Sequence, residues 1–213
     1  VGLPYTYKFL WAPLIDRFVI PVSFLSRRKG WLVFFQLLMS LVLFLLSFFR
    51  PTEDGVLLIA VLAFTLAFLS ASFDVVFDAW RAESLPKQIL GLGAAWSVIG
   101  YRLAMLTSGA IALMLADLYF GFPGIYRLIA LITFSLAMLA ILSPEPRITE
   151  RPKNLYLAIV EPFKEFFSRP SAMLILLTII FYKFGDAFTN SLSTAFLIRG
   201  AGFSAAEVGA VSK

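Results

Sequence analysis

The feature that most constrains this chain is a series of apolar runs, each long enough to cross a lipid bilayer as a helix. A membrane-spanning helix needs about 20 mostly apolar residues. Complete runs lie at 31–49, 56–77, 92–118, 125–142 and 171–198, with a partial run at 1–15 and a stub that begins near Ala205. Membrane-spanning strands are not expected, because no segment of strand length alternates strictly between apolar and polar residues. We therefore predict an all-α membrane protein with about six transmembrane helices and a stub.

Composition supports a membrane protein and removes several kinds of chemistry. The chain is 60% hydrophobic and its mean hydropathy is +0.89, whereas soluble domains are about 45–50% apolar. It contains no cysteine and no histidine. Thiol nucleophiles, Ser-His-Asp triads and histidine-ligated metals are therefore excluded from this chain. We expect no metal, no cofactor and no enzymatic activity.

Basic residues alternate between the predicted connections, and this alternation indicates an orientation. The first, third and fifth connections together carry eleven Lys or Arg residues, whereas the second, fourth and sixth together carry only Arg50 and Arg199. Connections rich in Lys and Arg tend to stay in the cytoplasm. We therefore expect the odd connections to be cytoplasmic, with membrane lipids around the spans. The net charge of +5 is then explained by orientation rather than by nucleic-acid binding.

The fifth connection is the longest and divides the chain. It begins with Pro144 and Pro146, which cannot continue a helix. Residues 154–168 mix apolar and charged side chains in a pattern typical of an amphipathic segment on a membrane surface, in which Pro162 is expected to break or start a helix. We predict a partial N-terminal helical half at 1–143, a cytoplasmic amphipathic linker at 144–170 and the start of a C-terminal half at 171–213.

Several short motifs match one family of transporters. Asp16-Arg17, followed by Arg27-Arg28 and Gly30, resembles the signature between helices 2 and 3 of the major facilitator superfamily. Narrower matches to the anhydromuropeptide permeases of that superfamily lie in family order at 7–17, 72–80, 100–103, 182–188, 196–200 and 207–209. Phe73 departs from the pattern, because the family often has Gln at this position. The chain resembles these permeases over nearly its whole length.

This resemblance implies both a fold and an activity. The fold would be part of the major facilitator arrangement, from the end of helix 2 to the start of helix 8, so both ends of the chain are expected to be cut. The activity would be proton-driven import of N-acetylglucosaminyl-1,6-anhydro-N-acetylmuramyl peptides across the bacterial inner membrane. The cellular roles would be peptidoglycan recycling and β-lactamase induction.

Charged residues inside the predicted spans are the candidate transport residues, because an unpaired charge in a membrane is costly. At about 1.5 Å per residue, Arg102 lies about 15 Å into its run and Lys183 about 18 Å into its run. Either cation is expected to bind a substrate carboxylate, and Asp74 or Asp186 to couple protons. Alternatively, Lys183 and Asp186 only neutralise each other at i,i+3. A tyrosine precedes each of these cations in the sequence, Tyr101 and Tyr182, and is expected either to stack on a sugar ring of the substrate or only to pack.

A second set of charged candidates lies toward the cytoplasmic ends of the spans. By resemblance, four of them form a latch between the two halves of the transporter: Asp16, Arg17, Arg27 and Arg28. The alternative is that these residues only orient the chain. Asp78 and Arg81 are expected to close a gate or to be structural. Small residues between 91 and 109 are expected to let helices pack closely.

Three other functions remain open from the sequence. The chain could belong to a major facilitator transporter of another organic anion, such as acetyl-CoA. It could belong to a membrane enzyme acting on a lipid-linked sugar, for which Asp74 and Asp78 are a candidate acid pair that no His or Cys supports. It could also be a membrane sensor, although charged residues on several spans argue against that.

Overall fold

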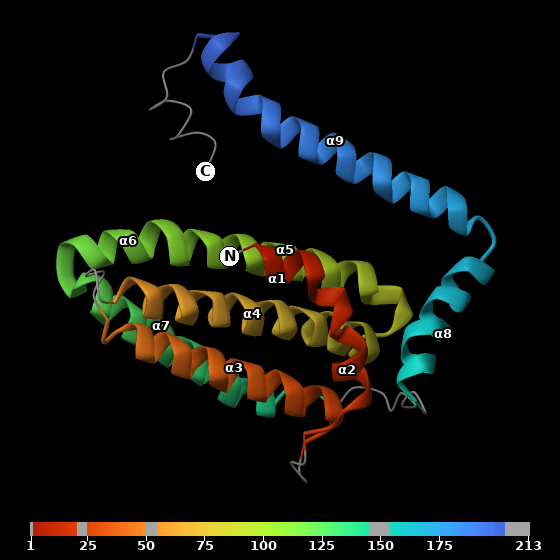
Figure 1. Ribbon diagram of the computed structural model, residues 1–213, viewed down its shortest axis with the longest axis horizontal. Coiled ribbons are helices and arrows are strands. Elements are labelled where there is room, and N and C mark those ends of the chain that lie inside the picture. The colour runs from red at the N-terminus through yellow and green to blue at the C-terminus, as the bar shows by residue number, and fades with distance from the viewer. Residues whose placement is uncertain (1, 21–24, 50–54, 145–153, 203–213) are drawn as a thin grey trace. The chain divides into compact units, whose positions relative to one another are not determined.

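The computed structural model describes residues 2–20, 25–49, 55–144 and 154–202, in which the regular secondary structure is helical and no strand occurs. Two units are distinguished, Val1–Ala158 and Ile159–Lys213. In the first unit, α3 packs against both α4 and α7, and the three helices lie side by side in Figure 1. The predicted all-α class is confirmed.

The helices of the first unit follow the apolar runs closely. Their bounds in chain order are α1 Leu3–Tyr7, η1 Lys8–Leu10, α2 Ala12–Arg17, α3 Arg27–Leu46, α4 Val56–Ser84, η2 Lys87–Ile89, α5 Leu90–Leu106, η3 Thr107–Ile111, α6 Ala112–Leu115, η4 Ala116–Phe120 and α7 Gly121–Ile141. Four stretches of the described chain are long and apolar enough to cross a membrane: Arg27–Leu46, Val56–Ser84, Lys87–Ile141 and Ala172–Thr189. By length and composition these four stretches agree with a multi-pass membrane protein, for which the sequence predicted about six spans.

Two helices extend beyond their apolar runs, because charged residues continue them instead of ending them. The run predicted at 31–49 becomes α3, which begins at Arg27 and ends at Leu46. The run predicted at 56–77 becomes α4, which begins at Val56 as expected and continues to Ser84. The additional turns carry side chains that form ion pairs, so their polar character does not oppose the helix.

A small apolar core joins α2, α3 and α4. Its fully or nearly fully buried members are Ile15, Leu32, Phe35, Val42, Leu46, Leu69 and Val76. Phe73, Phe77 and Trp80 stack in series along α4 and pack against this core. Between helices in a bilayer such contacts act through van der Waals packing, because lipid is as apolar as these side chains. The core therefore fixes the register of the segment before Arg17 against α4.

The partial run at 1–15 is not one helix, which corrects the sequence interpretation. It divides into α1, the 3₁₀ turn η1 and α2. Pro13 lies in the first turn of α2, where its missing backbone N–H needs no partner, and Trp11 at the junction has φ −107° and ψ −4°. The 3₁₀ turn between the two short helices begins at Lys8, a residue that contributes to the site described below.

The connection expected between the runs at 92–118 and 125–142 is also shorter than predicted. Helical structure continues to Phe120 and resumes at Gly121, where φ is +64° and ψ is 170°. Only glycine adopts this backbone conformation readily, and the chain turns back there between α6 and α7 (Figure 1). The run predicted at 92–118 is also irregular, because η3 and η4 are π-helical.

Two helices complete the described chain. α8 is Leu155–Ser168, and the side chain of Asn154 accepts a hydrogen bond of 2.8 Å from the N–H of Leu157 at its start. Pro162 lies inside α8, so the expectation that it would break or start a helix is wrong. Its ring removes one internal hydrogen bond, and the helix continues on both sides. α9 is Ala172–Arg199. The stub expected near Ala205 lies outside the described residues.

Candidate functional site

An ion pair joins the broken N-terminal segment to the interior part of α4. The Nζ atom of Lys8 donates a hydrogen bond to the Asp74 carboxylate. Asp74 lies ten residues before the end of α4 at Ser84, which is about 15 Å along the helix axis. Both side chains are partly accessible, at 32% for Lys8 and 45% for Asp74. The pair therefore lies far from the C-terminal end of α4, and both of its side chains remain partly exposed.

Two neutral hydrogen bonds flank this pair and hold the same two segments together. The hydroxyl of Tyr5 donates to Ser70 Oγ at 2.7 Å, and Trp11 Nε1 donates to Ser72 Oγ at 3.0 Å. Ser72 is fully buried and its own hydroxyl donates to the carbonyl of Phe68. We call these two hydrogen bonds together with the Lys8–Asp74 pair the polar seam. The seam orients Lys8 toward α4 from both sides.

A denser group of charges lies at the end of α4, and we call it the end cluster: Asp16, Arg27, Arg28 and Glu83. The Arg28 guanidinium binds both Glu83 oxygens, with the shortest distance 2.7 Å, and also donates to Asp16. Its side chain is only 8% exposed. Arg27 donates to the backbone carbonyl of Asp16 and lies 4.0 Å from Glu83. Three segments, α2, α3 and α4, are therefore joined by one buried guanidinium.

Neighbouring residues extend the polar contacts at this end of the unit. Lys29 is buried, and its Nζ atom donates a hydrogen bond of 2.9 Å to the carbonyl of Ser143, just after α7. Arg81 and Asp78 form an ion pair of 2.9 Å one helical turn apart on α4. The pairing that the sequence suggested for these two residues is present, while a gating role for them stays a prediction.

The candidates on α5 and α9 are placed differently from those on α4. Arg102 and Tyr101 are exposed on α5, and the Arg102 guanidinium has no hydrogen bond or ion pair with another described residue. Lys183 and Tyr182 are exposed on α9. The side chain of Asp186 lies outside the described residues, so its proposed pairing with Lys183 is not observed or excluded. Asp74 and Asp78 on α4 are paired with Lys8 and Arg81.

Sequence reasoning missed two residues that the structure brings into contact with the predicted ones. Lys8 lies in a motif of the family resemblance but was given no role, and Glu83 was not considered. Glu83 could have been found from the topology, because it lies in the same predicted cytoplasmic region as Arg28. Lys8 could not be assigned to Asp74 in this way, since their contact depends on the break at Trp11.

These contacts define what the described residues can do chemically. A lysine paired with a carboxylate can separate when the carboxylate takes a proton, because the attraction between the two charges is then lost. A guanidinium held by two acids can fasten three helices together at one end. No group of three or more acidic side chains suited to a metal ion occurs within the described ranges.

Comparison with known proteins supports the same family as the sequence motifs. A family model described as Major Facilitator Superfamily matches residues 6–212. The whole chain is 49% identical to the anhydromuropeptide permease of Escherichia coli K12 and covers 43% of that protein. It is 39% identical to an uncharacterized protein of Haemophilus influenzae, covering 50% of it. Over 99% of its length it is 35% identical to a Rickettsia felis protein named putative transporter AmpG 4, covering 52%. The chain thus spans about half or less of these relatives, and the resemblance predicted from its motifs is confirmed.

Proposed function

Because the chain belongs to the Major Facilitator Superfamily, we propose that it is part of a proton-coupled transporter that imports anhydromuropeptides through the bacterial inner membrane. The observation that carries this proposal is the identity of 49% over the whole chain with a protein named anhydromuropeptide permease. The chain covers 43% of that relative. Transport is therefore proposed for the complete protein to which these helices belong.

The polar seam supplies a basis for proton coupling. In one state of the transporter, Lys8 neutralises the Asp74 carboxylate, as the ion pair indicates. In another state, a proton on Asp74 replaces that neutralisation and allows the two segments to separate. A charge buried without a partner in a membrane is unfavourable by several kcal/mol. Exchange of one neutralising group for another therefore links protonation to the packing of the N-terminal segment on α4.

Arg102 is the proposed contact for the substrate. Anhydromuropeptides carry carboxylates on their peptide, and a guanidinium can donate two parallel hydrogen bonds to a carboxylate. Arg102 lies twelve residues after the start of α5, or about 18 Å along the helix. Its lack of an acidic partner among the described residues supports this assignment, because an arginine at such a depth stays charged. Lys183, Tyr101 and Tyr182 are proposed to contribute from their exposed positions.

The end cluster is proposed to act as a latch on the cytoplasmic side. Arg28 already binds Asp16 and Glu83 within the first unit, so a partner from the other half of the transporter would have to compete with these contacts. The positive-inside pattern supports the cytoplasmic assignment of this end. The chain would then comprise a partial N-terminal half at 1–143, a linker at 144–170 and the start of a second half at 171–213.

The experiment that tests the proposed substrate is a competition assay with the complete protein in cells that lack other muropeptide uptake. Labelled N-acetylglucosaminyl-1,6-anhydro-N-acetylmuramyl tripeptide should accumulate, and unlabelled anhydromuropeptide should compete with it. Acetyl-CoA should not compete. Uptake of labelled acetyl-CoA, without uptake of the labelled muropeptide, would instead indicate a superfamily transporter for a different organic anion.

A further inference from the structure

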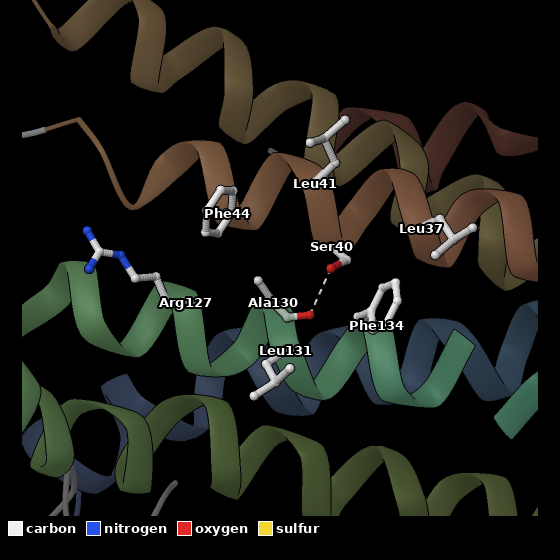
Figure 2. A pocket seen from close by; sticks show the side chains of 8 residues that line it. All are labelled: Leu37, Ser40, Leu41, Phe44, Arg127, Ala130, Leu131 and Phe134. Carbon is white, nitrogen blue, oxygen red and sulfur yellow. Dashed lines mark hydrogen bonds between the residues drawn. The ribbon is translucent and has the colours of Figure 1, made fainter. Parts of the chain in front are cut away.

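A groove between α3 and α7 lies apart from the polar seam and the end cluster. Figure 2 shows the eight residues that line it: Leu37, Ser40, Leu41, Phe44, Arg127, Ala130, Leu131 and Phe134. The groove has a volume of about 430 Å³, and its walls are apolar. Arg127 lies at one end of the row and is its only charged member (Figure 2). The groove therefore has an apolar length and a cationic end.

The floor of the groove offers no polar group to an occupant. Ser40 Oγ donates a hydrogen bond of 2.8 Å to the carbonyl of Ala130, and both residues are buried. Small residues at this contact let α3 and α7 approach closely. Because the one polar contact on the floor is already made between the helices, the groove is suited to a hydrocarbon chain.

The guanidinium of Arg127 is held at the end of α3. Its Nε atom donates to Ser47 Oγ at 3.3 Å, and its central carbon lies 5.5 Å from the ring centroid of Phe48. These contacts position the group without neutralising its charge. A guanidinium has five N–H donors, so most of them are available for an anionic group beside the groove.

The side chains on the rim favour a lipid over another helix as the occupant. Leu41, Phe44, Leu131 and Phe134 are all large and exposed. Helix interfaces within membranes instead favour small residues that allow close approach. Such a surface exists elsewhere in the chain, on α5, where glycine and alanine are frequent and no residue is buried. The rim of the groove between α3 and α7 carries large side chains instead of small ones.

We propose that this groove binds one anionic phospholipid, with its phosphate at Arg127 and an acyl chain along α3 and α7. Arg127 and Phe134 are seven residues apart, which gives a groove about 10 Å long, enough for the upper part of an acyl chain. Arg127 lies six residues inside α7, about 9 Å from its start. A long arginine side chain at this depth reaches the headgroup level. The site is independent of the proposed transport function.

The test is native mass spectrometry of the purified complete protein, titrated with phosphatidylglycerol and with phosphatidylethanolamine of the same acyl chains. The parent protein should retain one phosphatidylglycerol molecule in preference to phosphatidylethanolamine. Arg127→Gln should weaken phosphatidylglycerol binding by about fivefold, the effect of one basic residue near an anionic lipid surface. Arg127→Lys should keep the preference, because it keeps the charge. Leu41→Trp should weaken binding by filling the groove.

A matched control separates this site from general attraction between lipid and basic residues. Arg199→Gln removes one exposed cation from the end of α9 and should leave the phosphatidylglycerol preference unchanged. The proposal is overturned if the parent binds both lipids equally, or if Arg127→Gln retains the full preference. It is also overturned if Arg199→Gln has the same effect as Arg127→Gln, or if Leu41→Trp binds phosphatidylglycerol as the parent does.

Discussion

Lys8 and Asp74, 66 positions apart in the sequence, form an ion pair that joins the 3₁₀ turn η1 to α4. The contact exists because the N-terminal segment is broken before α2 and because its apolar side chains pack against the core on α4. It places an acid and a base together inside a predicted membrane span. Under the proposed function, protonation of this pair changes how the N-terminal segment packs on α4.

Replacement of either member of this pair should impair transport by the complete protein. Lys8→Met leaves the Asp74 carboxylate without its cation, and Asp74→Asn leaves Lys8 without its anion. Each single change should lower the initial rate of muropeptide uptake by about tenfold or more, equivalent to at least ~1.4 kcal/mol. Uptake should be normalised to the amount of protein in the membrane.

A charge exchange provides the control for that experiment. The double variant Lys8→Asp with Asp74→Lys restores an ion pair of opposite polarity, so membrane levels should recover relative to the single variants Lys8→Asp and Asp74→Lys. Proton-driven uptake should remain low, because the carboxylate has moved off α4. If both neutral single variants transport at the parental rate, the pair has no part in coupling.

Arg28 should be a main determinant of the stability of this unit. Removing one member of a buried ion pair typically lowers the free energy of unfolding by about 3–5 kcal/mol, and the Arg28 side chain is 8% exposed. Arg28→Ala should therefore lower the thermal unfolding temperature of the purified protein markedly. Arg169→Ala, which breaks the exposed Arg169–Glu165 pair on α8, should change stability by less than about 1 kcal/mol. Equal melting temperatures for the two variants would contradict the assignment.

Asp16 should affect the rate of transport more than the stability of the protein. Arg28 retains its contact with Glu83 when Asp16 is replaced, so Asp16→Asn should insert and fold normally. If the end cluster is a latch, this variant should show slower uptake at unchanged membrane levels. Parental uptake rates would mean that the signature residues only orient the chain.

Arg102 should be required for substrate binding. Arg102→Lys keeps the positive charge but loses the two parallel hydrogen bonds that fit a carboxylate, so uptake should fall well beyond any loss of protein. Arg102→Ala should abolish uptake. Arg127→Lys serves as a comparison, because it makes the same replacement away from α5. Normal import by both Arg102 variants would exclude this residue from the site.

The sequence predicted the helices better than it predicted their ends. Apolar runs reveal membrane spans because lipid can surround them, and Val56 was placed correctly as the start of α4. The ends were missed where charged residues continue a helix, as at Arg27 and Glu83. A prediction from hydropathy assigns charged residues such as these to loops. In the structure they remain helical, and ion pairs between the helices satisfy their charges.

The contacts of the candidate site depended on information that the sequence does not carry directly. The Asp78–Arg81 pair follows from helical spacing on a single element. The Lys8–Asp74 pair depends on a break in the first segment and on the relative register of two segments, and neither has a periodic signal. The turn at Gly121 was expected as a short loop, because its glycine indicated a turn but not its positive φ.

Proton-coupled import is tested most directly by uptake of labelled anhydromuropeptide by the complete protein in liposomes, with and without an imposed proton gradient. Uptake should be saturable, should rise when the outside is made acidic and should fall when a protonophore collapses the gradient. Asp74→Asn, reconstituted in equal amounts, should lose the response to the gradient. Absence of muropeptide uptake, or uptake by the parent protein that ignores the gradient, would contradict the account.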